Sequence, residues 1–205
     1  MYTIVDLEAT GGKFNEESII EIAIYKFDGV SITDQFISLV NPEKEIHPYV
    51  EKLTGISSKM LKTAPKFHEI AKRVIEITSE SILVAHNAQF DYRILQLEFK
   101  RLGFDFSMKS ICTVILSQEL LPEQESYKLG RLSITSLKML SIFSPGNSTI
   151  LFLIISCLTS FSKRSLNNST VASASPLARC LSLIGIPRLL DNLPSLYDSC
   201  SGSNS

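Results

Sequence analysis

The chain has 205 residues, and its 20 basic and 21 acidic side chains give a formal net charge of −1 at pH 7. This length fits one ordinary domain with a sizeable core, and the near-zero charge excludes a global basic field that would hold nucleic acid. The four cysteines have no C-x-x-C spacing, which argues against zinc and redox motifs and makes a reduced, cytoplasmic setting the default expectation.

Residues 1–133 predict an α/β domain in which a hairpin-led sheet is followed by alternating helices and strands. Strands are expected over 2–8, 19–27 and 32–40, the last two joined by a turn at Asp28-Gly29. A loop with short helical turns over 46–61 leads to a helix from Pro65 and a buried strand over 81–85. A second amphipathic helix over 91–102, a strand near 109–112 and a helix to 121 follow. The apolar face predicted for the helix from Pro65 comprises Phe67, Ile70, Ala71, Val74 and Ile75.

Two acids stand at the end of the first predicted strand, in the run Ile4-Val5-Asp6-Leu7-Glu8. Side chains two residues apart in a strand point to the same face, so the carboxylates of Asp6 and Glu8 should lie together. Like charges at this spacing repel unless a cation lies between them, and hard divalent cations prefer such oxygens. A solvent-facing strand end with two solvated acids is the alternative.

A second motif, His86-Asn87-Ala88-Gln89-Phe90-Asp91, follows the strand predicted over 81–85 and opens a helix. Functional sites often lie at strand-to-helix junctions of this kind. Asp91 would add a third carboxylate near Asp6 and Glu8. By itself, an acid in the first turn is more commonly a helix cap.

These two motifs resemble those of the DEDD-type 3′–5′ exonucleases, in the subgroup that contains the proofreading epsilon subunit of bacterial DNA polymerase III. The family's acid-x-acid motif followed by Thr-Gly stands here as residues 6–11, and its second motif as residues 86–91. Segments between the motifs are also similar, and the resemblance covers residues 1–133. The segments in question are Asn41-Pro42, Leu53-Thr54-Gly55-Ile56, Met60-Leu61 and Ala64-Pro65-Lys66-Phe67.

The resemblance implies a ribonuclease-H-like fold with a mixed sheet, and two-metal hydrolysis of phosphodiesters with Mg²⁺ or Mn²⁺. It implies that Asp6 bridges both metals, that Glu8 binds the metal that activates water, and that Asp91 supports the second metal through solvent. The substrate-binding residues that it implies are Ala9, Thr10, Gly11, Asn87 and Phe90, although Phe90 could equally be a core aromatic. The implied partner is nucleic acid, in the first place single-stranded or frayed DNA 3′ ends, with RNA and an associated DNA polymerase left open; no membrane partner is expected.

The family's third motif, a His followed by an Asp on the last helix, has no counterpart in this chain. In the family this His is the general base, but no His follows His86 in this sequence. We expect His86 to order its loop rather than act as a base, and we assign no role to His47 or His68. Loss of the motif predicts an impaired enzyme, or else a non-catalytic remnant that binds nucleic acid weakly.

Residues 134–205 differ from the rest of the chain, because they are rich in serine and contain only two acids, Asp191 and Asp198. Reading the codons of 191–202 on the opposite strand, shifted by one base, permits residues 122–133 in reverse order and in register. Further decoding, from 187 back to 167, permits a His-Arg-Ala-x-Gly-Asp segment like the missing motif. We therefore hypothesise an inversion, or an inverted-repeat assembly error, that joins an incomplete exonuclease domain (1–133) to an antisense-derived tail not selected to fold. Coincidence is the alternative.

Overall fold

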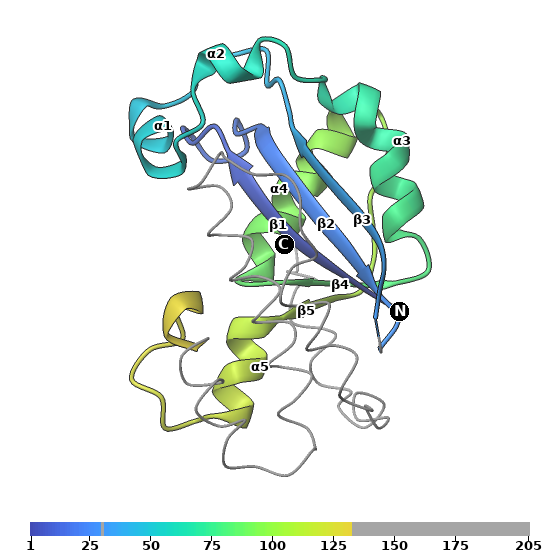
Figure 1. Ribbon diagram of the computed structural model, residues 1–205, viewed down its shortest axis with the longest axis vertical. Coiled ribbons are helices and arrows are strands. Elements are labelled where there is room, and N and C mark those ends of the chain that lie inside the picture. Colours follow the sequence, from blue (N-terminus) through green and yellow to red (C-terminus); the bar gives the residue numbers. More distant parts are fainter. Residues whose placement is uncertain (30, 133–205) are drawn as a thin grey trace, which may run out of the picture.

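The computed structural model describes residues 1–29 and 31–132, which form a five-stranded mixed sheet flanked by helices (Figure 1). The strands are β1 (Tyr2–Ala9), β2 (Ile19–Phe27), β3 (Ile32–Leu39), β4 (Ile82–Ala85) and β5 (Ser110–Cys112), in the order β3-β2-β1-β4-β5. The first three strands pair antiparallel, whereas β1, β4 and β5 pair parallel. The predicted α/β class with a mixed sheet is confirmed. The hypothesis of an antisense-derived, poorly folded tail concerns residues outside the described ranges and stays a prediction.

The helices are α1 (Pro48–Thr54), α2 (Ser58–Leu61), α3 (Phe67–Thr78), α4 (Ala88–Arg101) and α5 (Thr113–Leu120). Helix α3 begins two residues later than predicted, because the Glu69 carboxylate accepts a hydrogen bond from the backbone N–H of Lys66 and closes the first turn there. Ile75 was wrongly placed on the buried face of this helix, since it is 45% exposed. Within the described ranges, no helix is long and apolar enough to cross a membrane.

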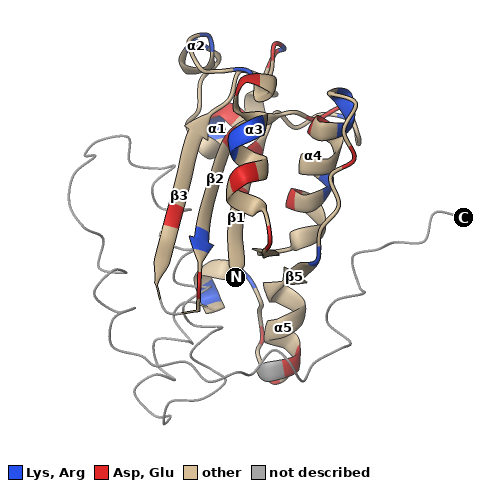
Figure 2. Ribbon diagram, turned by 90° about the vertical axis from the view of Figure 1, so that its right-hand side faces the viewer, with Lys and Arg blue, Asp and Glu red and all other residues tan. Residues whose placement is uncertain are grey.

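The main core lies between one face of the sheet and helices α3 and α4. Val5 and Leu7 of β1 pack with the buried faces of these helices, and the rings of Phe67 and Phe99 meet edge to face at 5.1 Å. Figure 2 shows acidic and basic residues together on α3 and on α4, rather than gathered into surfaces of one sign. Helices α3 and α4 therefore cover one face of β1, the face of Val5 and Leu7. The side chains that alternate with these two point to the opposite face of the sheet.

Candidate functional site

The two acids of β1 lie on the face of the sheet opposite the buried Val5 and Leu7. Burial raises the pKa of Asp6 to about 6, with the nearby charge of Glu21 contributing. Burial also raises the pKa of Glu8 to about 7, helped by the charges of Asp6 and Glu21. The structure thus brings Asp6 and Glu8 together as the sequence predicted, in surroundings where two negative charges are unfavourable without a cation.

Glu21 on β2 joins this pair, and the sequence analysis did not single it out. Glu8 and Glu21 are direct cross-strand partners in the antiparallel β1–β2 ladder, so their side chains share a face. The register shifts immediately afterwards, where Ala9 pairs with Ile19 and β2 carries one extra residue. The one signal in the sequence for Glu21 would have been an antiparallel pairing of residues 2–8 with residues 19–27, in addition to the predicted hairpin of 19–27 with 32–40.

Asp91 lies in the first turn of α4 and reaches the edge of β1. The pairing of β1 with β4 ends at Ile4↔Val84, and farther along β1 the backbone N–H of Leu7 donates to the Asp91 Oδ1 at 3.0 Å. The Asp91 residue is only 5% exposed. Burial raises the pKa of Asp91 well above its usual value, the charge of Asp6 adds to this, and the Leu7 N–H opposes it. The structure therefore brings all three predicted acids into one electrostatically linked group.

This group suits a hard divalent cation by donor type, because it offers only carboxylate oxygens. It is not a closed cage, since no three Asp, Glu, His or Cys side chains in residues 1–29 and 31–132 are arranged to hold a metal ion. One oxygen of Asp91 is already engaged with the Leu7 N–H. A bound cation would therefore have to draw the carboxylates closer together.

The segment after Glu8 forms a turn in which the Thr10 backbone N–H donates to the Ser18 carbonyl at 2.8 Å and the Thr10 carbonyl accepts from the His47 N–H at 3.0 Å. Ala9 and Thr10 are buried, and the Thr10 hydroxyl accepts from the Ser18 N–H at 3.1 Å and donates to the Gly11 carbonyl at 3.1 Å. Gly11 has a φ of +68°, and a Cβ there would meet the Val50 Cγ2 at 2.9 Å. Only glycine fits both the backbone conformation and the close approach of α1.

The second motif forms a tight junction between β4 and α4. Asn87 adopts the left-handed conformation, with φ 65° and ψ 52°, and α4 begins at the next residue, three residues earlier than predicted. The His86 Nδ1 lies 2.9 Å from the Thr113 hydroxyl, and burial lowers the pKa of His86. These contacts suit the ordering role expected for His86. Phe90 is 38% exposed, which excludes the alternative that it is a core aromatic.

The other two histidines lie on the surface. His47 precedes α1, where its Nδ1 accepts a hydrogen bond from the backbone N–H of Tyr49 at 3.2 Å and caps the helix. His68 is exposed in the first turn of α3. Neither histidine is assigned a chemical role.

Comparison with known protein families identifies the family of the chain. The profile of the exonuclease family RNase_T matches residues 3–137, about two thirds of the chain. The chain belongs to the exonuclease family. This confirms the resemblance drawn from the two motifs, and the match extends four residues past the point where the motif-based resemblance ended.

Curated relatives of this exonuclease-family chain are much longer proteins. The chain is 35% identical over 132 residues to the PolC-type DNA polymerase III of Caldanaerobacter subterraneus subsp. tengcongensis, which covers 64% of the chain and 9% of the relative. It is 34% identical over 134 residues to the 3′–5′ exonuclease DinG of Bacillus subtilis, covering 64% of the chain and 14% of the relative. The chain therefore corresponds to a small part of each of these proteins.

Solved exonuclease structures share the fold. Exonuclease X, in complex with 5′ overhanging duplex DNA, aligns with a TM-score of 0.55 and 23% identity over 88% of this chain and 99% of its own. The nuclease domain of 3′hExo bound to rAMP aligns with a TM-score of 0.57 and 20% identity over 78% of this chain and 92% of its own. The ribonuclease-H-like fold predicted from the resemblance is confirmed.

Proposed function

We propose that the exonuclease-family chain has the site of a metal-dependent 3′–5′ exonuclease that removes nucleotides from DNA 3′ ends, with Asp6, Glu8 and Asp91 as its metal ligands. The observation that carries the proposal is that these three carboxylates, each with a raised pKa, converge where the end of β1 meets the first turn of α4. Family membership supports the same reading. Mg²⁺ or Mn²⁺ is the proposed cofactor, because both accept oxygen-only ligands.

The roles proposed for the three acids are those that the family resemblance implies. Asp6 is the central acid, since its charge influences both Glu8 and Asp91, and it would be shared between two cations. Glu8 would hold one cation and Asp91 would support the other. Two such cations activate the attacking water and stabilise the leaving oxygen of an in-line displacement.

The nucleotide-binding role is assigned to the segments that flank the acids. Thr10 and Gly11 form a rigid turn directly after Ala9, the last residue of β1; the backbone N–H and carbonyl of Thr10 are bonded to Ser18 and His47, so the turn would offer the Gly11 backbone N–H to the nucleotide. Asn87, immediately before α4, and Phe90, in its first turn, precede Asp91 along the chain, and the exposed ring of Phe90 can contact a base or sugar. We propose single-stranded or frayed DNA ends as the substrate. The 5′ overhanging duplex in the solved complex of exonuclease X supports DNA as the nucleic acid, and the similarity to a polymerase supports association with a DNA polymerase.

A second candidate function is that of a non-catalytic remnant that binds nucleic acid weakly. The specific observation in its favour is that no His follows His86, so the general base of the family's third motif is missing. Loss of a general base costs about two to four orders of magnitude in rate. We therefore propose that any catalysis by this chain is impaired.

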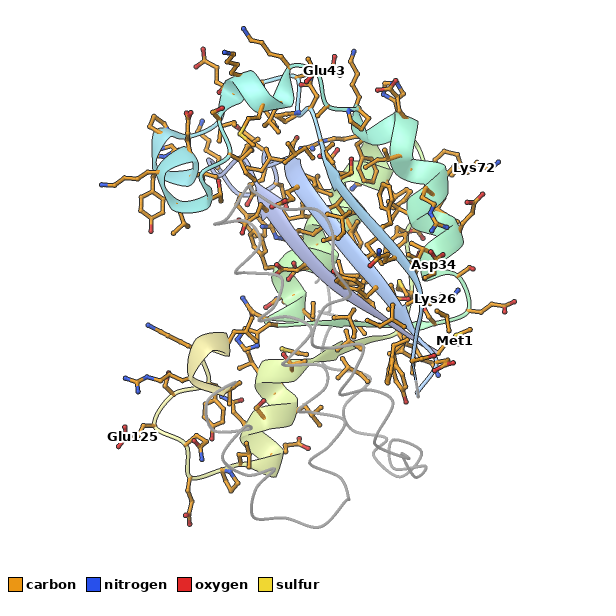
Figure 3. All side chains as sticks on the ribbon, in the orientation of Figure 1. Met1, Lys26, Asp34, Glu43, Lys72 and Glu125 are labelled. Carbon is orange, nitrogen blue, oxygen red and sulfur yellow. The ribbon has the colours of Figure 1, made fainter. Side chains whose placement is uncertain are left out.

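The test is release of nucleotides from the 3′ end of a 5′-labelled single-stranded DNA, with Mg²⁺, with Mn²⁺ and with EDTA. The proposal expects slow, metal-dependent shortening that Asp6→Ala abolishes. Asp34→Asn is the control, because Asp34 lies on β3 at the far edge of the sheet from β4 and β5 (Figure 3). Binding of the DNA without metal-dependent shortening would instead support the remnant.

A further inference from the structure

The loop between β1 and β2 is fastened to α4 by side chains that the proposed chemistry does not use. Arg101 of α4 donates to the Glu17 carbonyl and to the Ser18 hydroxyl, both at 2.8 Å. Glu98, only 7% exposed, accepts from the Ile19 N–H at 3.1 Å and pairs with Arg101 at 3.2 Å. These contacts fix the end of the loop where β2 begins. The middle of the loop, nearer to Gly11, is held by another residue of α4.

Arg93 fastens that middle part. Its guanidinium donates to both carboxylate oxygens of Glu17, at 2.8 and 3.1 Å, and to the Asn15 side chain at 3.3 Å. It also lies over the Phe14 ring, 4.2 Å from the centroid, and 5.7 Å from the centroid of Phe90. A planar guanidinium can satisfy a bidentate carboxylate and stack on an aromatic ring at the same time.

The Arg93–Glu17 pair is shielded enough to hold its geometry. The two side chains are 21% and 10% exposed, and the hydrogen bonds from Arg93 lower the pKa of Glu17. Exposed ion pairs contribute little, whereas a bidentate pair with limited access to water holds its partners in one arrangement. Phe14, although 72% exposed, is thereby held against α4.

Arg93 stands two residues after Asp91 on α4 and bonds the loop that follows Gly11. It therefore links the helix that carries Asp91 to the turn proposed to bind the nucleotide. The turn at Thr10 and Gly11 leads directly into the loop that Arg93 holds, and the Thr10 hydroxyl is itself bonded to Ser18 at the end of that loop. A shift of the loop on α4 would therefore move the turn relative to the acids.

We propose that Arg93 is a positioning residue for the 3′-terminal nucleotide, acting through Glu17 and Phe14 to hold the loop over residues 11–18 in register with Asp91. This inference rests on the proposed function, because it assumes that the turn at Thr10 and Gly11 receives the terminal nucleotide. It differs from a direct role in which Arg93 would bind a phosphate. In a direct role Glu17 would compete with the phosphate, whereas in a positioning role Glu17 is needed.

The experiment compares binding of a labelled thymidine oligonucleotide in linear and in circular form, with Ca²⁺ in place of Mg²⁺ so that ends are preserved. Only the linear form offers a 3′ end. The variants are Arg93→Met, Glu17→Gln and the two combined. Arg73→Met is the matched control, since Arg73 pairs with Asp34 at 2.5 Å and joins α3 to β3 in a similar way.

The proposal expects Arg93→Met and Glu17→Gln each to reduce the preference for linear over circular DNA by about tenfold, because a displaced turn loses its contact with the end. The double variant should be no worse than either single variant, and Arg73→Met should keep the preference. Amide hydrogen exchange over residues 12–18 should rise in both single variants without DNA.

Three results would overturn the inference alone. The first is that Glu17→Gln keeps or strengthens the preference while Arg93→Met weakens both forms of DNA. The second is that Arg73→Met lowers the preference equally, and the third is unchanged hydrogen exchange in the loop. Should Arg93→Met fail to fold, Glu17→Gln decides, since it removes a charge and keeps the size. A wild-type protein without preference for linear DNA overturns the proposed function and this inference together.

Discussion

Replacing Asp6 by Asn should stabilise the metal-free protein, and the gain should depend on pH. Asp6 is held in a buried place on β1 where Glu21 adds negative charge, and these effects raise its pKa from 3.8 to about 6. A neutral amide of nearly the same shape escapes both effects. The same substitution removes a proposed metal ligand, so it should be unfavourable only when metal is present.

The magnitude follows from the shift of about 2 pKa units, each of which corresponds to about 1.4 kcal/mol, so the charged form costs the folded state about 3 kcal/mol. The folded protein binds the proton more tightly than the unfolded chain does. Stability contributed by Asp6 is therefore intact below pH 3.8 and is lost as the pH rises to about 6. Asp6→Asn should gain up to about 3 kcal/mol at about pH 8, and close to nothing at about pH 4.

Urea unfolding in EDTA, followed by circular dichroism at both pH values, measures this difference. Asp34→Asn is the control of opposite sign, because the hydrogen bond from Arg73 lowers the pKa of Asp34 and its charged form favours the folded state. A stability difference between Asp6→Asn and wild type that is the same at both pH values would refute the reasoning. So would an Asp6→Asn variant that is less stable than wild type at about pH 8.

Three further predictions concern the cation, the turn and the α4 contacts. Mg²⁺ or Mn²⁺ should raise the unfolding temperature of the wild type, and Glu8→Gln should lose most of that rise in a thermal scan. Gly11→Ala should lower the free energy of unfolding in urea by about 2 kcal/mol or more, because the new Cβ adds a clash with Val50 to the strain of the backbone. Gly12→Ala is the control, since Gly12 has a φ of +106° and open space around it and should show backbone strain alone. Equal losses of stability in the two variants would contradict this reasoning. Glu98→Ala should cost about 3 kcal/mol, because the buried Ile19 N–H loses its acceptor and Arg101 loses its carboxylate partner, against less than about 0.5 kcal/mol for Glu76→Ala, whose pair with Lys72 is exposed.

The sequence predicted the acids of the site because local patterns carry them. The alternation of β1 fixes the common face of Asp6 and Glu8, and a strand-to-helix junction places Asp91. The fold class followed from the same local periodicities. Element ends were less accurate: α4 starts before Asp91, because Asn87 takes a left-handed conformation that helical periodicity does not reveal.

The residues that the sequence analysis missed depend on contacts between distant parts of the chain. Glu21 sits within an apolar run, and only the cross-strand register shows that it faces Glu8. Arg93 and Glu17 are separated by 76 positions, so their pairing appears only once α4 packs beside β1 and β2. Ile75 fits the helical period, yet α3 is rotated so that this position is 45% exposed.

The hydrogen bond between Asp91 and the Leu7 N–H bears on how inactive variants of this chain should be chosen. Removing the Asp91 side chain deletes a proposed ligand and also leaves a backbone donor of the central strand without its acceptor. An inactive Asp91 variant would therefore confound lost chemistry with a disturbed strand. Glu8, whose charge is disfavoured by burial and by the charges of Asp6 and Glu21, is the better choice for an inactive reference protein in crystallography or binding work.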